Sequence, residues 1–139
     1  MTKLNSILLL VIFFVCGCAT KLTPQEVATS SVMPESVAVK IFQKYGFPDM
    51  RKPFYASETR ICGGRASLVS ITSITKMVYT PSTKRLSLQN GGNYFNGSCP
   101  VVTFVDNVQS LDQAKELLQA AKALGAQTDT VYVMSGVFD

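Results

Sequence analysis

The chain has 139 residues, of which 47% are hydrophobic and 16% charged, with a formal net charge of +4. This length is enough for one domain with a single core, and the charge is too small to indicate nucleic acid as a partner. The chain has no histidine, the commonest catalytic base, which excludes the usual catalytic triads and most hydrolytic zinc sites in their usual forms.

The first residues have the pattern of a cleaved targeting segment. A short polar start containing Lys3 is followed by nine consecutive aliphatic or Phe residues at positions 7–15. The apolar stretch ends at Cys18, so it is shorter than the roughly 20 apolar residues that a membrane-spanning helix needs. Residues 1–17 are therefore predicted to be a signal peptide.

The end of this segment resembles the lipobox of bacterial lipoproteins. The aliphatic, variable, small and cysteine positions of that motif are occupied by Val15, Cys16, Gly17 and Cys18. The resemblance implies a diacylglycerol in thioether linkage on Cys18 and an acyl chain on the new amino terminus, with no other cofactor. Ala19 follows, where an Asp would imply inner-membrane retention, so the outer membrane facing the periplasm is expected. The alternatives are an ordinary secretory signal or a short uncleaved anchor.

The next segment, residues 18–33, is rich in Thr, Ser and small residues and is typical of a flexible tether. A helix is predicted over 34–45, since Pro34 suits a first turn and Glu35 complements the helix dipole. Gly46 ends it. The apolar stripe of this helix consists of Val37, Ala38, Ile41, Phe42 and Tyr45.

β-Branched and aromatic residues with turn signals predict a run of strands up to position 105. Their expected ranges are 54–61, 65–79, 84–89 and 100–105. The segment TPSTK before Arg85 is predicted to be a hairpin connection, so the strands on either side should pair antiparallel. In the long second strand the apolar residues change face, and a bulge near Ser73 would restore one apolar face.

Residues 90–99, NGGNYFNGSC, are predicted to form a loop, because Asn and Gly tolerate positive φ. Tyr94 and Phe95 at its tip form a candidate contact site. The alternative is that both rings fold back onto the core.

A second helix is predicted to begin at Ser110. Gln113 completes a capping box and Asp112 lies in the first turn. Gly125 marks the end of an apolar stripe that consists of Leu111, Ala114, Leu117, Leu118, Ala121 and Leu124. Residues 130–138 then predict a final strand, which is apolar on both faces and therefore central or covered.

This order of elements predicts a single α+β domain over residues 34–139. Both amphipathic helices need the apolar face of the sheet, so we expect a mostly antiparallel sheet of four to five strands with the two helices packed on one side.

Positive charge is concentrated in the middle of the sequence. Between positions 51 and 85, seven basic residues face one acid, Glu58, which gives this segment +6. Candidate contacts to an anionic surface such as lipid phosphates are Arg51, Lys52, Lys84 and Arg85. The alternative is that these are solvated charges on exposed strand faces.

Two cysteines remain once the signal peptide leaves and Cys18 is lipidated. In an oxidising periplasm such a pair, Cys62 and Cys99, predicts a disulfide. A metal site is the rival interpretation, but two thiols without histidine are too few ligands for zinc.

Turn, capping and ion-pair roles account for the carboxylates Asp106, Asp112 and Glu58. The sequence therefore favours a non-catalytic, membrane-anchored domain that binds an envelope protein or another envelope component. The alternative is a periplasmic carrier or sensor that holds a small apolar or anionic ligand between helix and sheet. An enzyme that uses Ser with Lys, or carboxylates, is the least favoured hypothesis.

Overall fold

The computed structural model describes residues 21–26, 33–58, 60–91 and 99–135. Over these ranges the chain forms two α-helices, two short 3-10 helices and seven β-strands. The predicted signal peptide, Cys18 and the loop residues Tyr94 and Phe95 lie outside the described residues.

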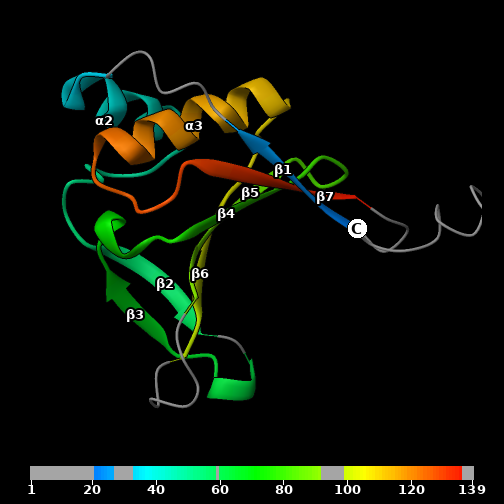
Figure 1. The fold of residues 1–139 in the computed structure, drawn as a ribbon. Coiled ribbons are helices and arrows are strands. Elements are labelled where there is room, and N and C mark those ends of the chain that lie inside the picture. The colour runs from blue at the N-terminus through cyan, green and yellow to red at the C-terminus, as the bar shows by residue number, and fades with distance from the viewer. Residues whose placement is uncertain (1–20, 27–32, 59, 92–98, 136–139) are drawn as a thin grey trace, which may run out of the picture.

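The strands form one mixed sheet in the order β1-β7-β4-β5-β6-β2-β3 (Figure 1). Their bounds are β1 Lys21–Glu26, β2 Phe54–Glu58, β3 Ala66–Val69, β4 Lys76–Thr80, β5 Arg85–Asn90, β6 Val101–Val105 and β7 Thr130–Ser135. Strands β4 and β7 pair in parallel, and the other five neighbouring pairs are antiparallel. The α+β class is confirmed, as are the β4–β5 hairpin and the interior position of the last strand. The expected number of four to five strands is too low.

One reason is that the predicted strand over 65–79 is two strands, β3 and β4. They are separated by the 3-10 helix η2, Ile71–Ser73. The hydroxyl oxygen of Ser70 accepts a hydrogen bond from the backbone N–H of Thr72 at 3.4 Å and so caps this turn. The predicted bulge near Ser73 is therefore wrong. The apolar residues change face because the chain turns at η2, which connects the edge strand β3 to β4 in the interior of the sheet.

The second reason is strand β1, which lies inside the segment predicted to be a tether. It pairs antiparallel with β7 over six residue pairs, from Lys21 opposite Ser135 to Glu26 opposite Thr130. These six residues are part of the sheet. Pro24 argues against a strand in the local sequence, but proline is tolerated in an edge strand such as β1.

Helices α2, Glu35–Lys44, and α3, Leu111–Ala123, lie together on one side of the sheet (Figure 1). The hydroxyl oxygen of Ser110 caps α3 by accepting from the N–H of Gln113 at 3.3 Å. The Gln113 side chain accepts in turn from the N–H of Gln109 at 2.8 Å, one residue earlier than the capping box predicts, and from the Tyr45 hydroxyl at 3.3 Å. Val37, which we assigned to the apolar stripe of the first helix, is 43% exposed.

The core lies between the two helices and one face of the sheet. Its largest fully buried side chains include Phe42, Met50, Ile74, Met77, Leu86, Leu88, Leu117 and Leu118. In the parts of the chain that the structure describes, no helix is both long and apolar enough to cross a membrane.

The predicted disulfide between Cys62 and Cys99 is confirmed. Cys62 ends the 3-10 helix η1, Arg60–Cys62, and Cys99 lies just before β6, with 6.0 Å between the two Cα atoms. The bond therefore joins the end of the β2 region to the start of β6.

Candidate functional site

The sheet presents its second face away from the helices. Along β4, Met77 and Tyr79 point into the core, so Val78 between them points to the other side. Val78 lies opposite Ser87 on β5, and Ser87 lies opposite Phe104 on β6. We term this surface, which no described helix covers, the open face.

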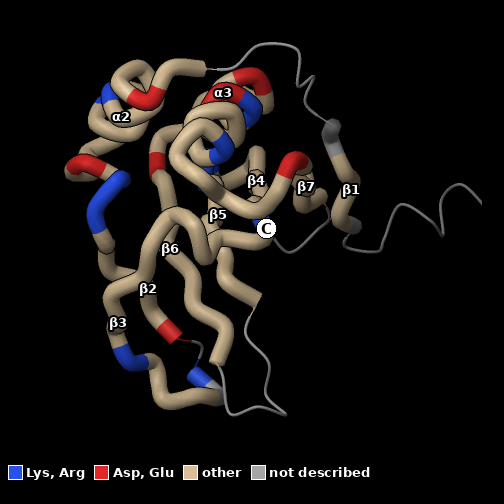
Figure 2. The backbone as a smooth tube through the Cα atoms, turned by 60° about the vertical axis from the view of Figure 1, so that its left-hand side comes forward, with Lys and Arg blue, Asp and Glu red and all other residues tan. Residues whose placement is uncertain are grey.

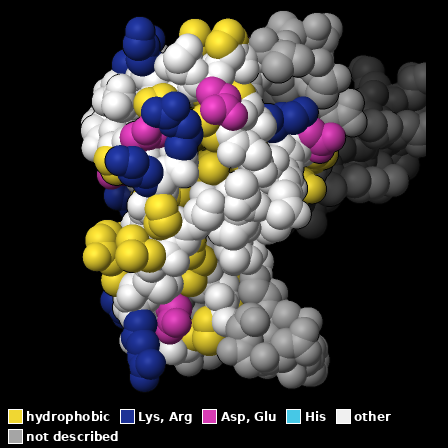
Figure 3. Space-filling view, turned by 90° about the vertical axis from the view of Figure 1, so that its left-hand side faces the viewer, with side chains coloured by type: hydrophobic (Ala, Val, Ile, Leu, Met, Phe, Trp, Pro, Cys, Tyr) yellow, Lys and Arg dark blue, Asp and Glu magenta, His cyan; other side chains and the backbone are white. Residues whose placement is uncertain are grey.

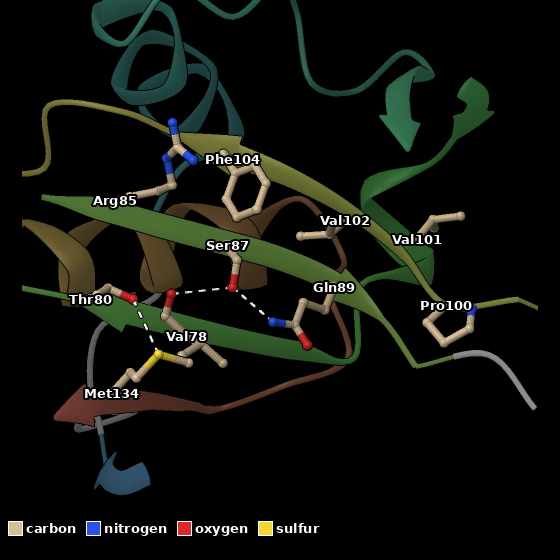
Figure 4. A pocket seen from close by; sticks show the side chains of 10 residues that line it. All are labelled: Val78, Thr80, Arg85, Ser87, Gln89, Pro100, Val101, Val102, Phe104 and Met134. Atoms are coloured by element: carbon tan, nitrogen blue, oxygen red, sulfur yellow. Dashed lines mark hydrogen bonds between the residues drawn. The ribbon is translucent and has the colours of Figure 1, made fainter. Parts of the chain in front are cut away.

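The open face contains a groove with a volume of about 400 Å³ (Figure 4). Val78 and Ser87 form its floor and are only 4% and 6% exposed. Its sides are formed by Val102 and Phe104 of β6 and by Met134 of β7. The volume falls in the range of about 300–1,000 Å³ that is usual for small-ligand sites.

Hydrogen bonds within the protein use the polar side chains of the groove (Figure 4). The hydroxyl of Ser87 donates to the carbonyl oxygen of Val78 at 3.3 Å, and Nε2 of Gln89 donates to the Ser87 oxygen at 2.8 Å. The Thr80 hydroxyl lies 3.9 Å from the sulfur of Met134, a weak acceptor. The groove therefore presents mainly carbon to a ligand.

A single charged side chain, Arg85, lines the groove among the described residues. Its Nε donates to Oδ1 of Asp106 at 2.7 Å, and its guanidinium carbon lies 4.6 Å from the centroid of the Phe104 ring. Both partners of the ion pair are exposed, so the pair contributes at most about 1 kcal/mol to stability. Its effect is to hold the guanidinium over the ring at one end of the groove.

Beside the groove lies a row of large exposed apolar side chains. Tyr55 is 70% exposed, Leu68 59% and Phe104 45%. Tyr55 lies opposite Leu68 on β3. Phe104 is on the neighbouring strand β6, where the hydroxyl of the preceding residue, Thr103, donates to the Tyr55 carbonyl oxygen at 2.6 Å. We term these three residues the apolar row. Figure 3 shows hydrophobic side chains gathered on the surface over β2 and β3.

Arg51 and Lys52, two of the four candidate contacts to an anionic surface, lie in the turn before β2. Arg51 forms a salt bridge with Asp49 in which Nη2 and Oδ2 are 2.6 Å apart. Hydrogen bonds from Arg51 lower the pKa of Asp49 to about 2. Lys52 is exposed beside this pair.

The other two, Lys84 and Arg85, lie at the β4–β5 hairpin. Lys84 has a φ of 53°, and its carbonyl oxygen accepts from the N–H of Val108 at 2.9 Å. The hairpin is at the right of the sheet in Figure 1 and the turn before β2 at its left. Figure 2 shows acidic residues interspersed with basic ones. The four candidates therefore form two separate pairs, and a carboxylate accompanies each.

The carboxylates that we considered as catalytic groups lie on three separate elements. Glu58 ends β2, Asp106 follows β6 in its ion pair with Arg85, and Asp112 is in the first turn of α3. Over the described ranges, no three His, Cys, Asp or Glu side chains are placed to hold a metal ion.

No protein-family model, curated protein or solved structure matches the chain. Neither the groove nor the apolar row was predicted from the sequence. The signal available in the sequence was the alternation of side chains along a strand. It points Tyr55 away from the side chains of Phe54 and Ala56, and Phe104 away from those of Thr103 and Val105.

Proposed function

We propose that this protein is a lipid-anchored, non-catalytic domain of the bacterial envelope that binds another envelope protein through its open face. The observation that carries the proposal is the apolar row. Its three large side chains remain 45–70% exposed on adjacent strands, whereas scattered single apolar residues would need no explanation.

The chemistry of the apolar row fits a protein partner. Aromatic side chains such as Tyr55 and Phe104 are enriched in protein interfaces and among the residues that contribute most to binding. Arginine is enriched at such sites too, and Arg85 lies over the Phe104 ring. All three residues belong to β-strands, so binding would need to order little additional backbone.

The proposed anchor is Cys18, and two observations support it. Its sequence context resembles a lipobox, and the Cys62–Cys99 disulfide is typical of proteins in an oxidising compartment such as the periplasm. Several acyl chains on one cysteine would hold a domain stably, since each buried methylene contributes about 0.8 kcal/mol and a single chain binds only marginally. We place the domain at the outer membrane, facing the periplasm.

Site-specific photo-crosslinking tests the partner. A photoreactive amino acid at Leu68 is expected to capture a discrete envelope protein in cells. The matched control is the same amino acid at Val37, which is 43% exposed but lies on α2 and so on the other side of the sheet. The proposal fails if neither position gives a discrete adduct, or if both give the same ones.

Metabolic labelling with a fatty-acid analogue tests the anchor. The Cys18→Ala variant is expected to lose the label, because its sulfur is the proposed attachment point. The Cys16→Ala variant changes the neighbouring cysteine of the same motif and should keep it. Label retained in Cys18→Ala would exclude this residue as the anchor.

The groove favours a second candidate function, the binding of a small apolar or anionic ligand. From the sequence we expected such a ligand between helix and sheet. The groove lies instead on the open face, with Val78 and Ser87 as its floor.

A further inference from the structure

We propose that the groove of the open face binds the acyl chain of an anionic amphiphile, with the head group beside Arg85. This site goes beyond the proposed partner binding, and it gives the second candidate function a ligand class. The proposed source of the ligand rests on the proposed anchor at Cys18, whereas its proposed chemistry does not.

The lining determines the chemistry of the ligand. The hydroxyl of Ser87 and the amide of Gln89 are hydrogen-bonded within the groove, and the hydroxyl of Thr80 faces a methionine sulfur. A ligand rich in hydrogen-bonding groups would have to leave water without gaining equivalent partners there. A hydrocarbon chain gains from burial and has no hydrogen bonds to water to lose.

The shape of the groove favours a linear chain. Its side chains come from four neighbouring strands, β7, β4, β5 and β6. Along β5 the lining runs from Arg85 to Gln89, and at about 3.3 Å per residue this is roughly 13 Å of groove parallel to the strands. Figure 4 shows Arg85, Thr80 and Met134 toward one end and Pro100 toward the other.

Arg85 supplies the charge for a head group. A guanidinium has five N–H donors, and the ion pair with Asp106 engages it through Nε. The Nη groups, which this pair does not use, suit a carboxylate or a phosphate, both of which Arg recognises in bidentate geometry.

The same end of the groove lies where the chain arrives from Cys18. Leu22 of β1 pairs with Met134, which lines the groove. Two residues, Ala19 and Thr20, separate Cys18 from Lys21, and the three Cα–Cα steps between them can span at most about 11 Å. An anchor at Cys18 would therefore hold this end of the groove close to the bilayer, within reach of lipid.

Photoaffinity labelling of the full chain in vesicles of phosphatidylethanolamine and phosphatidylglycerol tests the site. Two probes carry a diazirine in the acyl chain: a fatty acid, and a phosphatidylglycerol. Adducts from at least one probe are expected on β4, β5 and β6 residues that line the groove. Adducts from the fatty acid alone identify a free acid as the ligand, and adducts from the phosphatidylglycerol identify a bilayer lipid.

A pair of matched variants shows whether the groove is responsible. Val102→Lys places an ammonium in the lining and should lower groove labelling about tenfold, whereas Val37→Lys makes the same change on α2 and should leave it unchanged. Arg85→Gln should weaken labelling by the anionic fatty acid but not by the matching fatty alcohol, and Arg51→Gln should alter neither. Labelling spread over the surface, or equal losses in both lysine variants, would overturn the proposal.

The Cys18→Ala full chain separates this inference from the proposed anchor. Groove adducts with the free fatty acid in that variant show an acyl-chain site whether or not Cys18 is lipidated. Loss of groove adducts in every form of the chain, while Leu68 still crosslinks to a partner, would reject the acyl-chain site and leave the proposed function intact.

Discussion

At the scale of single residues, Tyr79 is a buried polar group on which the core depends. It is 2% exposed, and its hydroxyl donates to the carbonyl oxygen of Val108 at 2.7 Å, which joins β4 to the segment before α3. Tyr79→Phe leaves that carbonyl oxygen without its partner. We expect the free energy of unfolding to fall by about 1–3 kcal/mol, as measured by urea denaturation.

The matched control for this change is Tyr55→Phe. It removes the same hydroxyl from a ring that is 70% exposed, so the free energy of unfolding should change by less than about 0.5 kcal/mol. Equal effects of the two substitutions would show that the Tyr79 hydrogen bond contributes nothing specific.

The same tyrosine makes stability depend on pH in the alkaline range. Burial raises the pKa of Tyr79 above its ordinary value of 10.0, so the folded protein holds this proton more tightly than the unfolded chain does. The resulting stabilisation is complete below pH 10 and is lost as the pH rises toward the folded-state pKa. Urea denaturation across this range should therefore show the stability of wild type falling more steeply than that of Tyr79→Phe. Parallel curves would contradict the assignment.

Some residue roles could be predicted from the sequence and others could not. Composition and compartment were enough to pair Cys62 with Cys99, because no other cysteine remained in the predicted mature domain. The apolar row was not predictable in the same way. Alternation shows that Tyr55 and Phe104 point away from their neighbours, but which side of the sheet the helices cover depends on contacts between distant segments.

At the scale of elements, the disulfide is the covalent link between η1 and the start of β6. It closes a loop with a sequence separation of 37, for which the chain-entropy relation gives a stabilisation of about 4 kcal/mol. We expect the double variant Cys62→Ser, Cys99→Ser to unfold at a lower urea concentration. Dithiothreitol should lower the wild-type midpoint toward that of the variant and should not affect the variant itself. A wild-type midpoint that is insensitive to the reductant would contradict this.

The end of α3 depends on a close contact between Gly125 and η2. Gly125 has a φ of +106°, and a Cβ there would lie 2.9 Å from Cγ2 of Thr72. Gly125→Ala should therefore be destabilising through both backbone strain, about 1–2 kcal/mol, and a steric clash. Gly46→Ala tests strain alone, since its φ is +90° and no atom lies within 4 Å of the added Cβ. Adding Thr72→Ser to Gly125→Ala should recover the steric part, as measured by thermal denaturation.

The helices were more predictable than the sheet because their signals are local. A polar cap at Ser110 and a stripe at 3.6-residue spacing are enough to place α3. Strand pairing depends instead on partners far away in the chain. The parallel pairing of β4 with β7 joins residues 77–79 to residues 131–133, and no local pattern specifies it.

At the scale of the whole molecule, β1 changes how the domain would sit relative to its proposed anchor. A tether reaching residue 33 would let the domain move up to about 50 Å from the bilayer. With β1 in the sheet from Lys21 onward, only two residues separate the sheet from Cys18. The open face, whose groove ends beside β1, would then be held near the membrane surface.

Truncation of the mature chain tests this arrangement. A fragment that begins at residue 34 lacks β1 and exposes the edge of β7, whose Val131 is fully buried. A fragment that begins at residue 21 keeps all six residue pairs of β1 with β7. We expect the shorter fragment to melt at least about 5 °C lower, since a loss of 1 kcal/mol shifts the melting temperature of a domain this size by several degrees. Equal melting temperatures for the two fragments would mean that residues 21–26 act as a tether after all.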